Sequence, residues 1–204
     1  MTPARAAFID RDGTVNELVP DSVTGHGESP LSAADVVLIP GAAGALRRLA
    51  ASGWLLVGVS NQPAAAKGTA SSIQLADVQA RVLELLARER VRFDDFRICP
   101  HHPEGVMPGL TRECECRKPA PGMLLNAARE LDIDPARSWM IGDTDSDVQA
   151  GRAAGCRTLL ITHQPSSHKR TGRAPADALS PSLGAAVTTL LSAERVDSGP
   201  WLAI

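Results

Sequence analysis

Carboxylates follow directly after two short apolar runs of this chain. Asp10 and Asp12 come after the run at residues 6–9, and Asp143 follows the run at residues 139–141. Parallel strands of an α/β sheet bring their carboxyl ends to one edge, where ligands bind. We therefore expect the three side chains to meet at that edge. Carboxylates this close repel one another unless a cation lies between them, and hard oxygen ligands suit Mg²⁺.

The same residues can carry phosphoryl-transfer chemistry. A carboxylate such as Asp10 can attack phosphorus and form an aspartyl-phosphate. A second carboxylate two residues on, Asp12, can protonate the leaving oxygen and later deprotonate the water that hydrolyses the intermediate. Ser60, which follows the apolar run at residues 55–59, and Lys118 can hold the phosphoryl oxygens through a hydroxyl and an ammonium group.

Each of these short strings also has an ordinary structural explanation. An isolated Asp10-x-Asp12 more often forms a turn or a helix cap than a catalytic pair, and Gly142-Asp143 is a common turn. The active-site interpretation depends on their combination. The strings that begin at Asp10, Ser60 and Gly142 each directly follow a buried-strand pattern. Lys118-Pro119 stands between the second and the third of these strings.

Three of the four cysteines lie in a loop rich in proline and glycine. Three thiolates and one imidazole form a closed tetrahedral set that is typical of structural zinc. The candidate zinc ligands are Cys99, His101, Cys114 and Cys116. The neighbouring His102 is the weaker candidate ligand. The alternative is a chance grouping of reduced thiols, but the loop has little apolar material with which to fold without a metal.

The zinc loop leads directly into two cations. Cys116 is followed by Arg117 and Lys118. A metal that anchors Cys116 would fix the start of the segment that presents both cations to a phosphate. We therefore hypothesise that zinc acts indirectly, by positioning Arg117 and Lys118.

Apolar runs alternate with segments of helical spacing, which predicts an α/β fold with a mainly parallel sheet. The expected strands are residues 6–9, 55–59, 139–141 and 158–161, with short candidates at 36–39 and 96–98. The expected helices are residues 42–51, 72–90, 122–131, 146–154 and 183–193. We predict a single domain over residues 1–204, with a zinc loop at about 99–117, a polar insert at about 17–34 and a polar connection at 164–181.

Composition excludes several other classes of protein. Hydrophobic residues make up 44% and charged residues 22%, as in a folded globular protein and unlike a disordered chain. The net charge of −2 argues against a nucleic-acid partner. Apolar stretches are far shorter than the ~20 residues of a membrane span, and no secretory leader is evident. We expect a cytoplasmic monomer with no membrane partner.

Four motifs together resemble the haloacid dehalogenase (HAD) superfamily of phosphatases. They are Asp10-Arg11-Asp12-Gly13-Thr14, Ser60-Asn61-Gln62, Lys118-Pro119 and Gly142-Asp143-x-x-x-Asp147. The cysteine strings at 99–103 and 114–119 are more specific. They are similar to the zinc-binding branch that contains the heptose bisphosphate and histidinol-phosphate phosphatases. The resemblance covers residues 5–161 and implies a three-layer Rossmann-like fold without a large cap.

The resemblance implies metal and proton-transfer roles for three aspartates. Asp10 is implied as the nucleophile and as a magnesium ligand. Asp12 is implied as the general acid and base, and its backbone carbonyl as a second ligand. Asp143 is implied as the last magnesium ligand that the protein supplies.

The resemblance also implies how the phosphate is held. Ser60 and Lys118 are implied to bind it, and Asn61 and Arg117 to contact phosphate or substrate. Asp147 is implied to tune the surroundings of these groups. Asp145 is expected to cap the helix that follows it.

The sequence departs from the family pattern in two places. The insert at 17–34 is longer than the short glycine/aromatic loop of the heptose enzymes, and it carries Gly25-His26-Gly27. A solvated His26 is favoured over one that contacts substrate. Thr144 stands where relatives carry Lys or Arg, so one positive charge is missing. Both departures concern the substrate more than the reaction.

The expected function is Mg²⁺-dependent hydrolysis of a small sugar phosphate. The leading substrate is the 7-phosphate of a heptose 1,7-bisphosphate, and the alternative is histidinol phosphate or another small phosphomonoester. A phospho-accepting receiver domain is a remote alternative, because its acceptor normally lies on a middle strand after an upstream acidic pair. Here the acidic motif follows the first strand and contains its own acid, Asp12.

Overall fold

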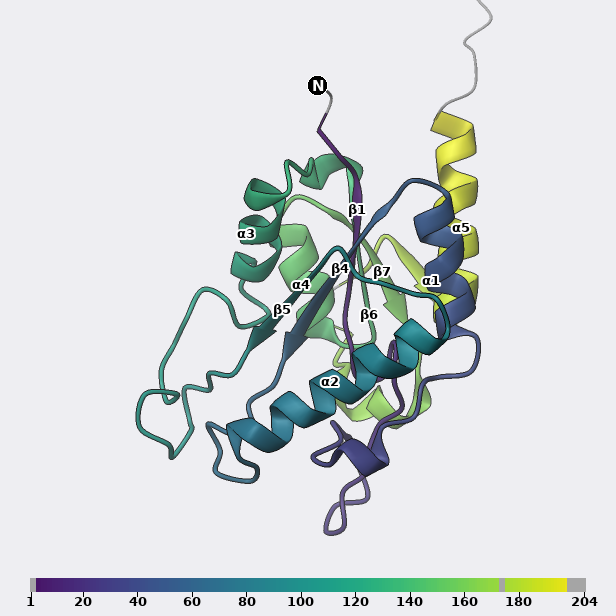
Figure 1. Ribbon diagram of the computed structural model, residues 1–204. Coiled ribbons are helices and arrows are strands. Elements are labelled where there is room, and N and C mark those ends of the chain that lie inside the picture. Colours follow the sequence, from purple (N-terminus) through teal and green to yellow (C-terminus); the bar gives the residue numbers. More distant parts are fainter. Residues whose placement is uncertain (1–2, 173–174, 198–204) are drawn as a thin grey trace, which may run out of the picture.

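The computed structural model describes residues 3–172 and 175–197, and its centre is a six-stranded parallel sheet (Figure 1). The strand order is β5-β4-β1-β6-β7-β8. The strands are β1 (Ala6–Ile9), β4 (Leu55–Asn61), β5 (Asp95–Cys99), β6 (Trp139–Gly142), β7 (Arg157–Ile161) and β8 (Ala178–Ser180). The chain leaves β1 toward β4 on one side and returns to β6 on the other. This reversal creates the crevice at the carboxyl ends of the strands where α/β proteins bind ligands.

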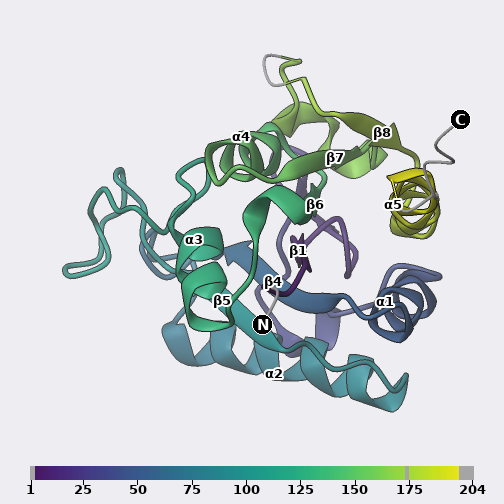
Figure 2. The same ribbon diagram turned by 90° about the horizontal axis from the view of Figure 1, so that it is seen from above.

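Helices cover both faces of the sheet (Figure 2). α1 (Ala42–Ala51), α2 (Ser72–Arg88) and α5 (Leu183–Asp197) lie on one face, and α3 (Gly122–Glu130) and α4 (Asp145–Ala153) lie on the other. Successive side chains of a strand point to opposite faces. In β1, Ala7 and Ile9 accordingly join one hydrophobic cluster, and Ala6 and Phe8 join the other. Burial on both faces explains the continuous apolar run and confirms the predicted three-layer fold.

Local signals fix the helix boundaries. A capping box begins α2, in which the Ser71 side chain accepts from the Gln74 backbone N–H and the Gln74 side chain binds back to Ser71. The helix ends at Arg88, two residues before the predicted end, because Arg90 adopts a left-handed φ of 57°. Gly53 follows α1 with a φ of 76°, a conformation that favours glycine.

The prediction differs from the structure mainly in the irregular segments. Residues 36–39 form no strand, and only Leu38 makes an isolated bridge, to Asn16. The chain there is held by single bonds such as that from the Ile39 N–H to the Val15 carbonyl. The insert at 17–34 contains the short hairpin β2 (Val19–Pro20) and β3 (Gly27–Glu28) and the 3₁₀ turn η1 (Ala33–Asp35).

The connection at 164–181 also contains structure that its polar composition did not predict. It forms the 3₁₀ helix η3 (Gln164–Lys169) and the edge strand β8. A further 3₁₀ turn, η2 (Pro135–Arg137), precedes β6.

No helix in the described part of the chain has the length and apolar character that crossing a membrane requires.

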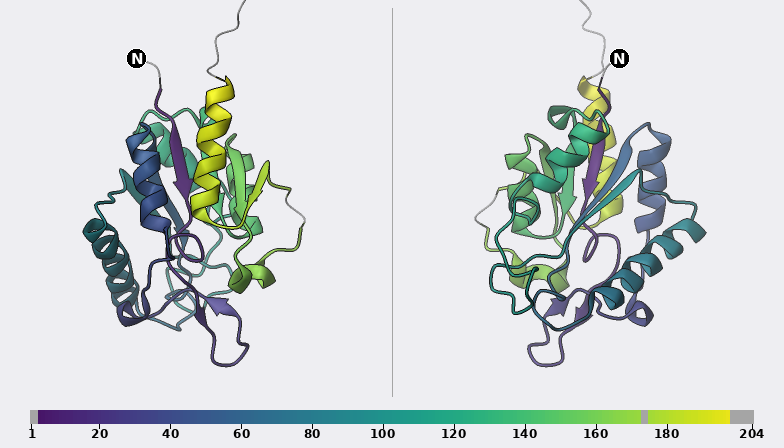
Figure 3. Two further views of the ribbon diagram at one scale, coloured as in Figure 1. Left: turned by 90° about the vertical axis from the view of Figure 1, so that its right-hand side faces the viewer. Right: turned by 60° about the vertical axis from the view of Figure 1, so that its left-hand side comes forward.

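The hairpin and η3 pack together beyond the carboxyl ends of the strands (Figure 3). A Cβ added to Gly27 would lie 2.7 Å from the Pro165 carbonyl oxygen and 2.9 Å from its Cβ. The absence of a side chain at Gly27 therefore permits this close approach. The two irregular segments form a wall beside the carboxyl-end crevice.

Candidate active site

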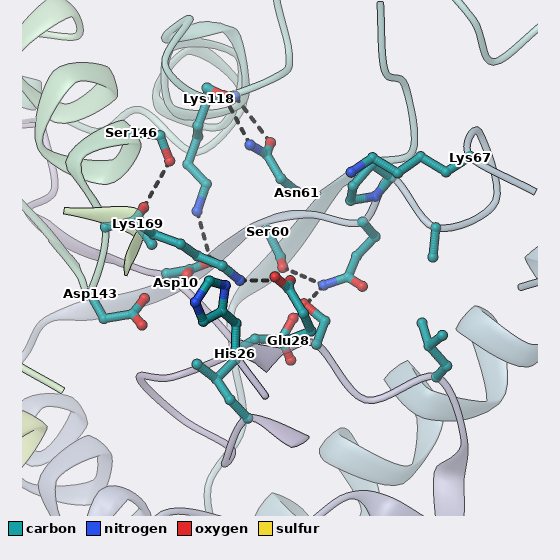
Figure 4. A pocket seen from close by; sticks show the side chains of 18 of the residues that line it. Asp10, His26, Glu28, Ser60, Asn61, Lys67, Lys118, Asp143, Ser146 and Lys169 are labelled. Atoms are coloured by element: carbon teal, nitrogen blue, oxygen red, sulfur yellow. Dashed lines mark hydrogen bonds and ion pairs between the residues drawn. The ribbon is translucent and has the colours of Figure 1, made fainter. Parts of the chain in front are cut away.

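A pocket of about 730 Å³ opens at the carboxyl ends of the strands (Figure 4). Its walls come from the ends of β1 and β4, the segment before α3, the loop after β6, the insert and η3. All seven residues predicted for catalysis, phosphate or magnesium line it: Asp10, Asp12, Ser60, Asn61, Arg117, Lys118 and Asp143. The topology therefore brings together residues that lie far apart in the sequence.

The Lys118 side chain is buried and lines this pocket. Its Nζ donates to Asp10 Oδ1 at 2.7 Å, to Asp147 Oδ1 at 2.6 Å and to the Val59 carbonyl at 2.7 Å. Burial alone would lower the pKa of Lys118, but the Asp10 and Asp147 carboxylates hold that pKa above its usual range. Lys118 therefore remains charged and fixes the position of Asp10.

Asp143 provides the clearest indication of a cation site. Both of its carboxylate oxygens are buried without a hydrogen-bond partner. Carboxylate oxygens of Asp10, Asp143 and Asp147 lie within 4.8 Å of one another. Burial, with the charges of Asp10 and Asp147, raises the pKa of Asp143. Unpartnered buried oxygens beside a second carboxylate fit a hard divalent cation such as Mg²⁺.

Asp147 uses its oxygens differently. Oδ1 accepts from Lys118, and Oδ2 accepts from the Thr144 backbone N–H at 3.0 Å and from its hydroxyl at 2.7 Å. Asp147 therefore positions Lys118 and closes the capping box that begins α4 at Thr144.

The expectation that Asp145 caps this helix is wrong. Asp145 is the first residue of α4, and its Oδ2 accepts from the backbone N–H and hydroxyl of Thr171.

Gly13 allows the first motif to approach Asp143. Its φ is 79°, and a Cβ at this position would overlap the Asp143 carboxylate. A side chain at this position would therefore be strained in its backbone and would also displace the candidate metal ligand.

Asp12 is held by partners that the sequence analysis did not assign. Arg11 donates to its two oxygens at 3.1 and 3.0 Å, Asn16 donates at 2.9 Å, and Gln62 donates at 2.6 Å. Burial alone would raise the pKa of Asp12, but the charge and hydrogen bonds of Arg11, with those of Asn16 and Gln62, hold it below its usual value. Asp12 is therefore ionised in this substrate-free arrangement. Arg11 is only 1% exposed and is anchored by Gln79 at 2.9 Å.

Ser60 and Asn61 end β4 and face different partners. The Ser60 hydroxyl oxygen accepts from Gln62 at 2.8 Å, which leaves its own hydrogen free to donate. Asn61 holds the main chain of Lys118, donating to its carbonyl at 2.9 Å and accepting from its N–H at 3.0 Å. A contact from Asn61 to phosphate stays a prediction, since its amide here fixes the residue that carries the ammonium group.

The four predicted zinc ligands converge. Three of their separations are Cys116 Sγ to Cys99 Sγ at 3.2 Å, Cys116 Sγ to Cys114 Sγ at 3.3 Å, and His101 Nδ1 to Cys116 Sγ at 3.4 Å. Ligands about 2.3 Å from a tetrahedral zinc lie roughly 3.8 Å apart, so these positions need only a small expansion. His102 lies outside the cluster, and its Nδ1 accepts from the Glu104 backbone N–H.

The zinc loop is tied to the pocket at two points. Arg117 Nη1 donates to the carbonyl of His101 at 3.3 Å. The Gly122 backbone N–H donates to the carbonyl of Glu115 at 2.9 Å, and a Cβ on Gly122 would overlap that carbonyl. The His101 carbonyl therefore positions Arg117, and the Glu115 carbonyl positions the start of α3.

The pocket lining also includes charged and aromatic side chains to which the sequence analysis gave no role in the site. Lys67, Lys169 and Glu28 lie there, with Lys169 Nζ donating to Glu28 at 2.8 Å. His26 also lines the pocket and stacks on His168, with ring centroids 4.3 Å apart. Lysine is rare in this chain, and that rarity was the only signal for Lys67 and Lys169, whose neighbours in sequence resemble ordinary loops.

Comparisons with known proteins identify the family. A family model described as HAD-hydrolase-like matches residues 115–186. The chain is 39% identical to the D-glycero-beta-D-manno-heptose-1,7-bisphosphate 7-phosphatase of Rhodopseudomonas palustris, over 74% of this chain and 79% of that one. It is 38% identical to the Yersinia pestis enzyme of the same name, over 84% of this chain and 87% of that one. The chain belongs to the HAD family of phosphatases.

A solved structure agrees with this assignment. The D,D-heptose 1,7-bisphosphate phosphatase of B. bronchiseptica, complexed with magnesium and phosphate, superimposes with a TM-score of 0.76 at 30% identity. The match covers 92% of this chain and 99% of that one. Because the relatives that match most of the chain at 38–39% identity are phosphatases, this chain is a phosphatase of the HAD type. The resemblance seen in the four sequence motifs is thus confirmed.

Divalent-cation binding should weaken as pH falls through about 6. Burial raises the pKa of Asp10 to about 6, with Lys118 opposing and Asp147 and Asp12 adding to the rise. Below that pH a proton competes for this carboxylate, so the apparent affinity for Mn²⁺ or Mg²⁺ should be about tenfold lower at pH 5 than at pH 7.5. Isothermal titration calorimetry measures this. An affinity that stays constant between these pH values would contradict the proposed participation of Asp10.

Replacing a predicted zinc ligand should affect turnover as well as metal content. We expect Cys116→Ser to lose the zinc of the purified protein and to lower turnover at least about tenfold, because Arg117 and Lys118 lose their anchor. Elemental analysis and steady-state kinetics check this. Cys156→Ala is the matched control, since Cys156 packs in the core outside the cluster. Metal-free protein with a folded loop and full turnover would show that zinc does not position these cations.

Proposed function

We propose that this phosphatase removes the 7-phosphate of a D-glycero-D-manno-heptose 1,7-bisphosphate through a phosphoenzyme on Asp10. The reaction is supported above all by one observation: Lys118 holds Asp10 beside Asp143, whose buried oxygens have no protein partner. The substrate is supported by the names of the relatives that match most of the chain. The pocket is also large enough for a phosphorylated sugar.

Asp10, Asp143 and the backbone carbonyl of Asp12 are the groups we assign to hold Mg²⁺. The bound ion would neutralise negative charge on the transferring phosphoryl group. Lys118 contributes a second positive charge through its hydrogen bond to Asp10. Its hydrogen bond goes to Oδ1 of Asp10, so we assign Oδ2 as the attacking atom.

The proposed reaction has two displacements at phosphorus. In the first, a bond forms between Asp10 Oδ2 and phosphorus, the bond from phosphorus to the sugar oxygen breaks, and Asp12 protonates that oxygen. In the second, Asp12 takes a proton from a water molecule that attacks phosphorus, and Asp10 is released. Asp12 is ionised before substrate binds, so it must take up a proton on binding. The negative charge of the substrate favours that uptake.

The Ser60 hydroxyl would donate a hydrogen bond to a phosphoryl oxygen. Lys118 already donates to three protein groups, so it would attract the phosphoryl oxygens through its charge. Gln62 occupies a lone pair of the Ser60 hydroxyl and so orients its hydrogen for donation to phosphate. Arg117 and Lys67 line the same pocket and would supply two positive charges for the second phosphate. Glu28, also in the lining, can accept hydrogen bonds from sugar hydroxyls.

A substrate comparison tests the proposed function. Phosphate release with Mg²⁺ should be compared for the two anomers of heptose 1,7-bisphosphate and for histidinol phosphate at matched concentrations. We expect one heptose anomer to be preferred by at least about tenfold in kcat/KM. A preference for histidinol phosphate would contradict the substrate and leave the phosphatase chemistry intact. Equally weak activity on all three would mean that the insert at 17–34 has changed the pocket.

Removing the nucleophile should abolish most activity. Asp10→Asn keeps the size of the side chain and its contact with Lys118 but lacks the nucleophilic charge. We expect turnover to fall at least ~10³-fold, equivalent to about 4 kcal/mol of barrier. Asp77→Asn, an exposed change on α2, controls for the loss of one carboxylate. Near wild-type turnover by Asp10→Asn would contradict the covalent mechanism.

Removing the acid should affect poor leaving groups most. Asp12→Asn cannot protonate the departing oxygen, so its defect should be larger for alkyl phosphates than for aryl phosphates, whose leaving groups need little protonation. A series of phosphomonoesters of different leaving-group pKa gives the measurement. Equal effects across the series would remove Asp12 from the role of general acid.

A further inference from the structure

The polar connection between β7 and β8 reaches back to the candidate metal site. Arg170 Nη1 donates to the Asp143 backbone carbonyl at 3.0 Å and to the Ser166 hydroxyl at 2.8 Å. Ser166 is fully buried, and its hydroxyl lies 3.0 Å from the carbonyl oxygen of His163 and 3.4 Å from that of Asp143. The guanidinium thus joins the peptide of Asp143 to a buried anchor within the segment that contains η3.

The next residue holds the other side of the same loop. The backbone N–H and the hydroxyl of Thr171 both donate to Asp145 Oδ2 at 2.7 Å. Arg170 and Thr171 therefore contact the residues on either side of Thr144. Two consecutive residues of the connection fix the backbone between the end of β6 and the start of α4.

Asp143 depends on its backbone for orientation. Neither of its carboxylate oxygens has a hydrogen-bond partner among the described residues, so no side-chain bond holds it toward Asp10. Gly13 gives it room on the inner side, where a Cβ would overlap it. The carbonyl of Asp143 is held mainly by the bond from Arg170 at 3.0 Å, with a longer contact from the Ser166 hydroxyl at 3.4 Å. The guanidinium is thus bonded to the peptide, and the carboxylate remains available for a cation.

We propose that Arg170 is a positioning residue for the metal ligand Asp143. It holds the peptide of Asp143 so that the carboxylate faces Asp10 before the cation arrives. Such preorganisation of a ligand by an outer hydrogen bond increases metal affinity, and losing it commonly lowers that affinity 10–100-fold. This inference rests on the magnesium site of the proposed function and is independent of which phosphate ester is the substrate.

The chain offers a matched control for the proposal. Arg152, on α4, also donates a guanidinium hydrogen bond to a backbone carbonyl of the β7–β8 connection, that of Pro175. This second tether does not touch the loop that carries Asp143. Replacing Arg152 therefore removes an arginine hydrogen bond to the β7–β8 connection and leaves the bond from Arg170 to Asp143 in place.

The test compares Arg170→Met, Arg170→Lys and Arg152→Met with the wild type. Mn²⁺ binding is measured without substrate by electron paramagnetic resonance, and Mg²⁺ dependence is measured in phosphatase assays. We expect Arg170→Met to raise the Mn²⁺ Kd and the half-saturating Mg²⁺ concentration about tenfold. At saturating Mg²⁺, kcat should recover and KM for the phosphate ester should be unchanged. Arg170→Lys should restore part of the affinity, and Arg152→Met should match the wild type.

Several results would overturn the inference. Wild-type Mn²⁺ affinity in Arg170→Met would do so, as would an equal loss of affinity in Arg152→Met, which would indicate general destabilisation. Thermal unfolding of each variant identifies a folding failure. If Arg170→Met does not fold, the test uses Arg170→Lys, and wild-type Mn²⁺ affinity in folded Arg170→Lys would overturn the inference. Wild-type protein that binds no Mn²⁺ would refute the magnesium site itself. Failure only with heptose bisphosphates would refute the substrate alone.

Discussion

One buried ammonium group balances the negative charge at the end of this sheet. Lys118 lies between Asp10 and Asp147, at 2.7 and 2.6 Å, and is only 3% exposed. Removing an ionised group from water costs several kcal/mol, so these carboxylates depend on a buried partner. Asp143, the neighbouring carboxylate, is left without one. The ammonium group of Lys118 therefore balances the negative charge of Asp10 and Asp147, whereas Asp143 is left suited to bind a cation.

Lys118 lies in an irregular segment, so its position depends on neighbouring contacts. The Asn61 amide bonds to both sides of its peptide, at 2.9 and 3.0 Å. Glu115, just before it, contacts Gly122 at the start of α3. The cysteine and histidine cluster closes the same loop around Cys116. A structural metal at this cluster would thus contribute to catalysis through electrostatics, by keeping a cation at a fixed distance from Asp10, the proposed nucleophile.

The sequence predicted most of the parallel sheet and the residues at its carboxyl edge, because the inner strands β1, β4, β6 and β7 are short, largely buried and followed at once by polar groups. The partners of Asp12 were harder to predict. Arg11 is charged and yet buried, and only the tertiary structure reveals that Gln79 and Asp12 accommodate it. The role of Arg170 was also hidden, since a Ser/Pro/basic connection has the composition of an exposed loop. The local pattern of residue types in this connection does not show that it folds back onto Asp143.

The central claim is that Asp10 becomes phosphorylated. Trapping the intermediate tests this most directly, using Asp12→Asn with an aryl phosphate, whose departure needs little acid while hydrolysis of the phosphoenzyme still needs the base. After acid quench and borohydride reduction, peptide mass spectrometry should find homoserine at position 10, the product of a reduced acyl phosphate. Turnover of the aryl phosphate with unmodified Asp10 at every time point would contradict the account and indicate direct attack by water.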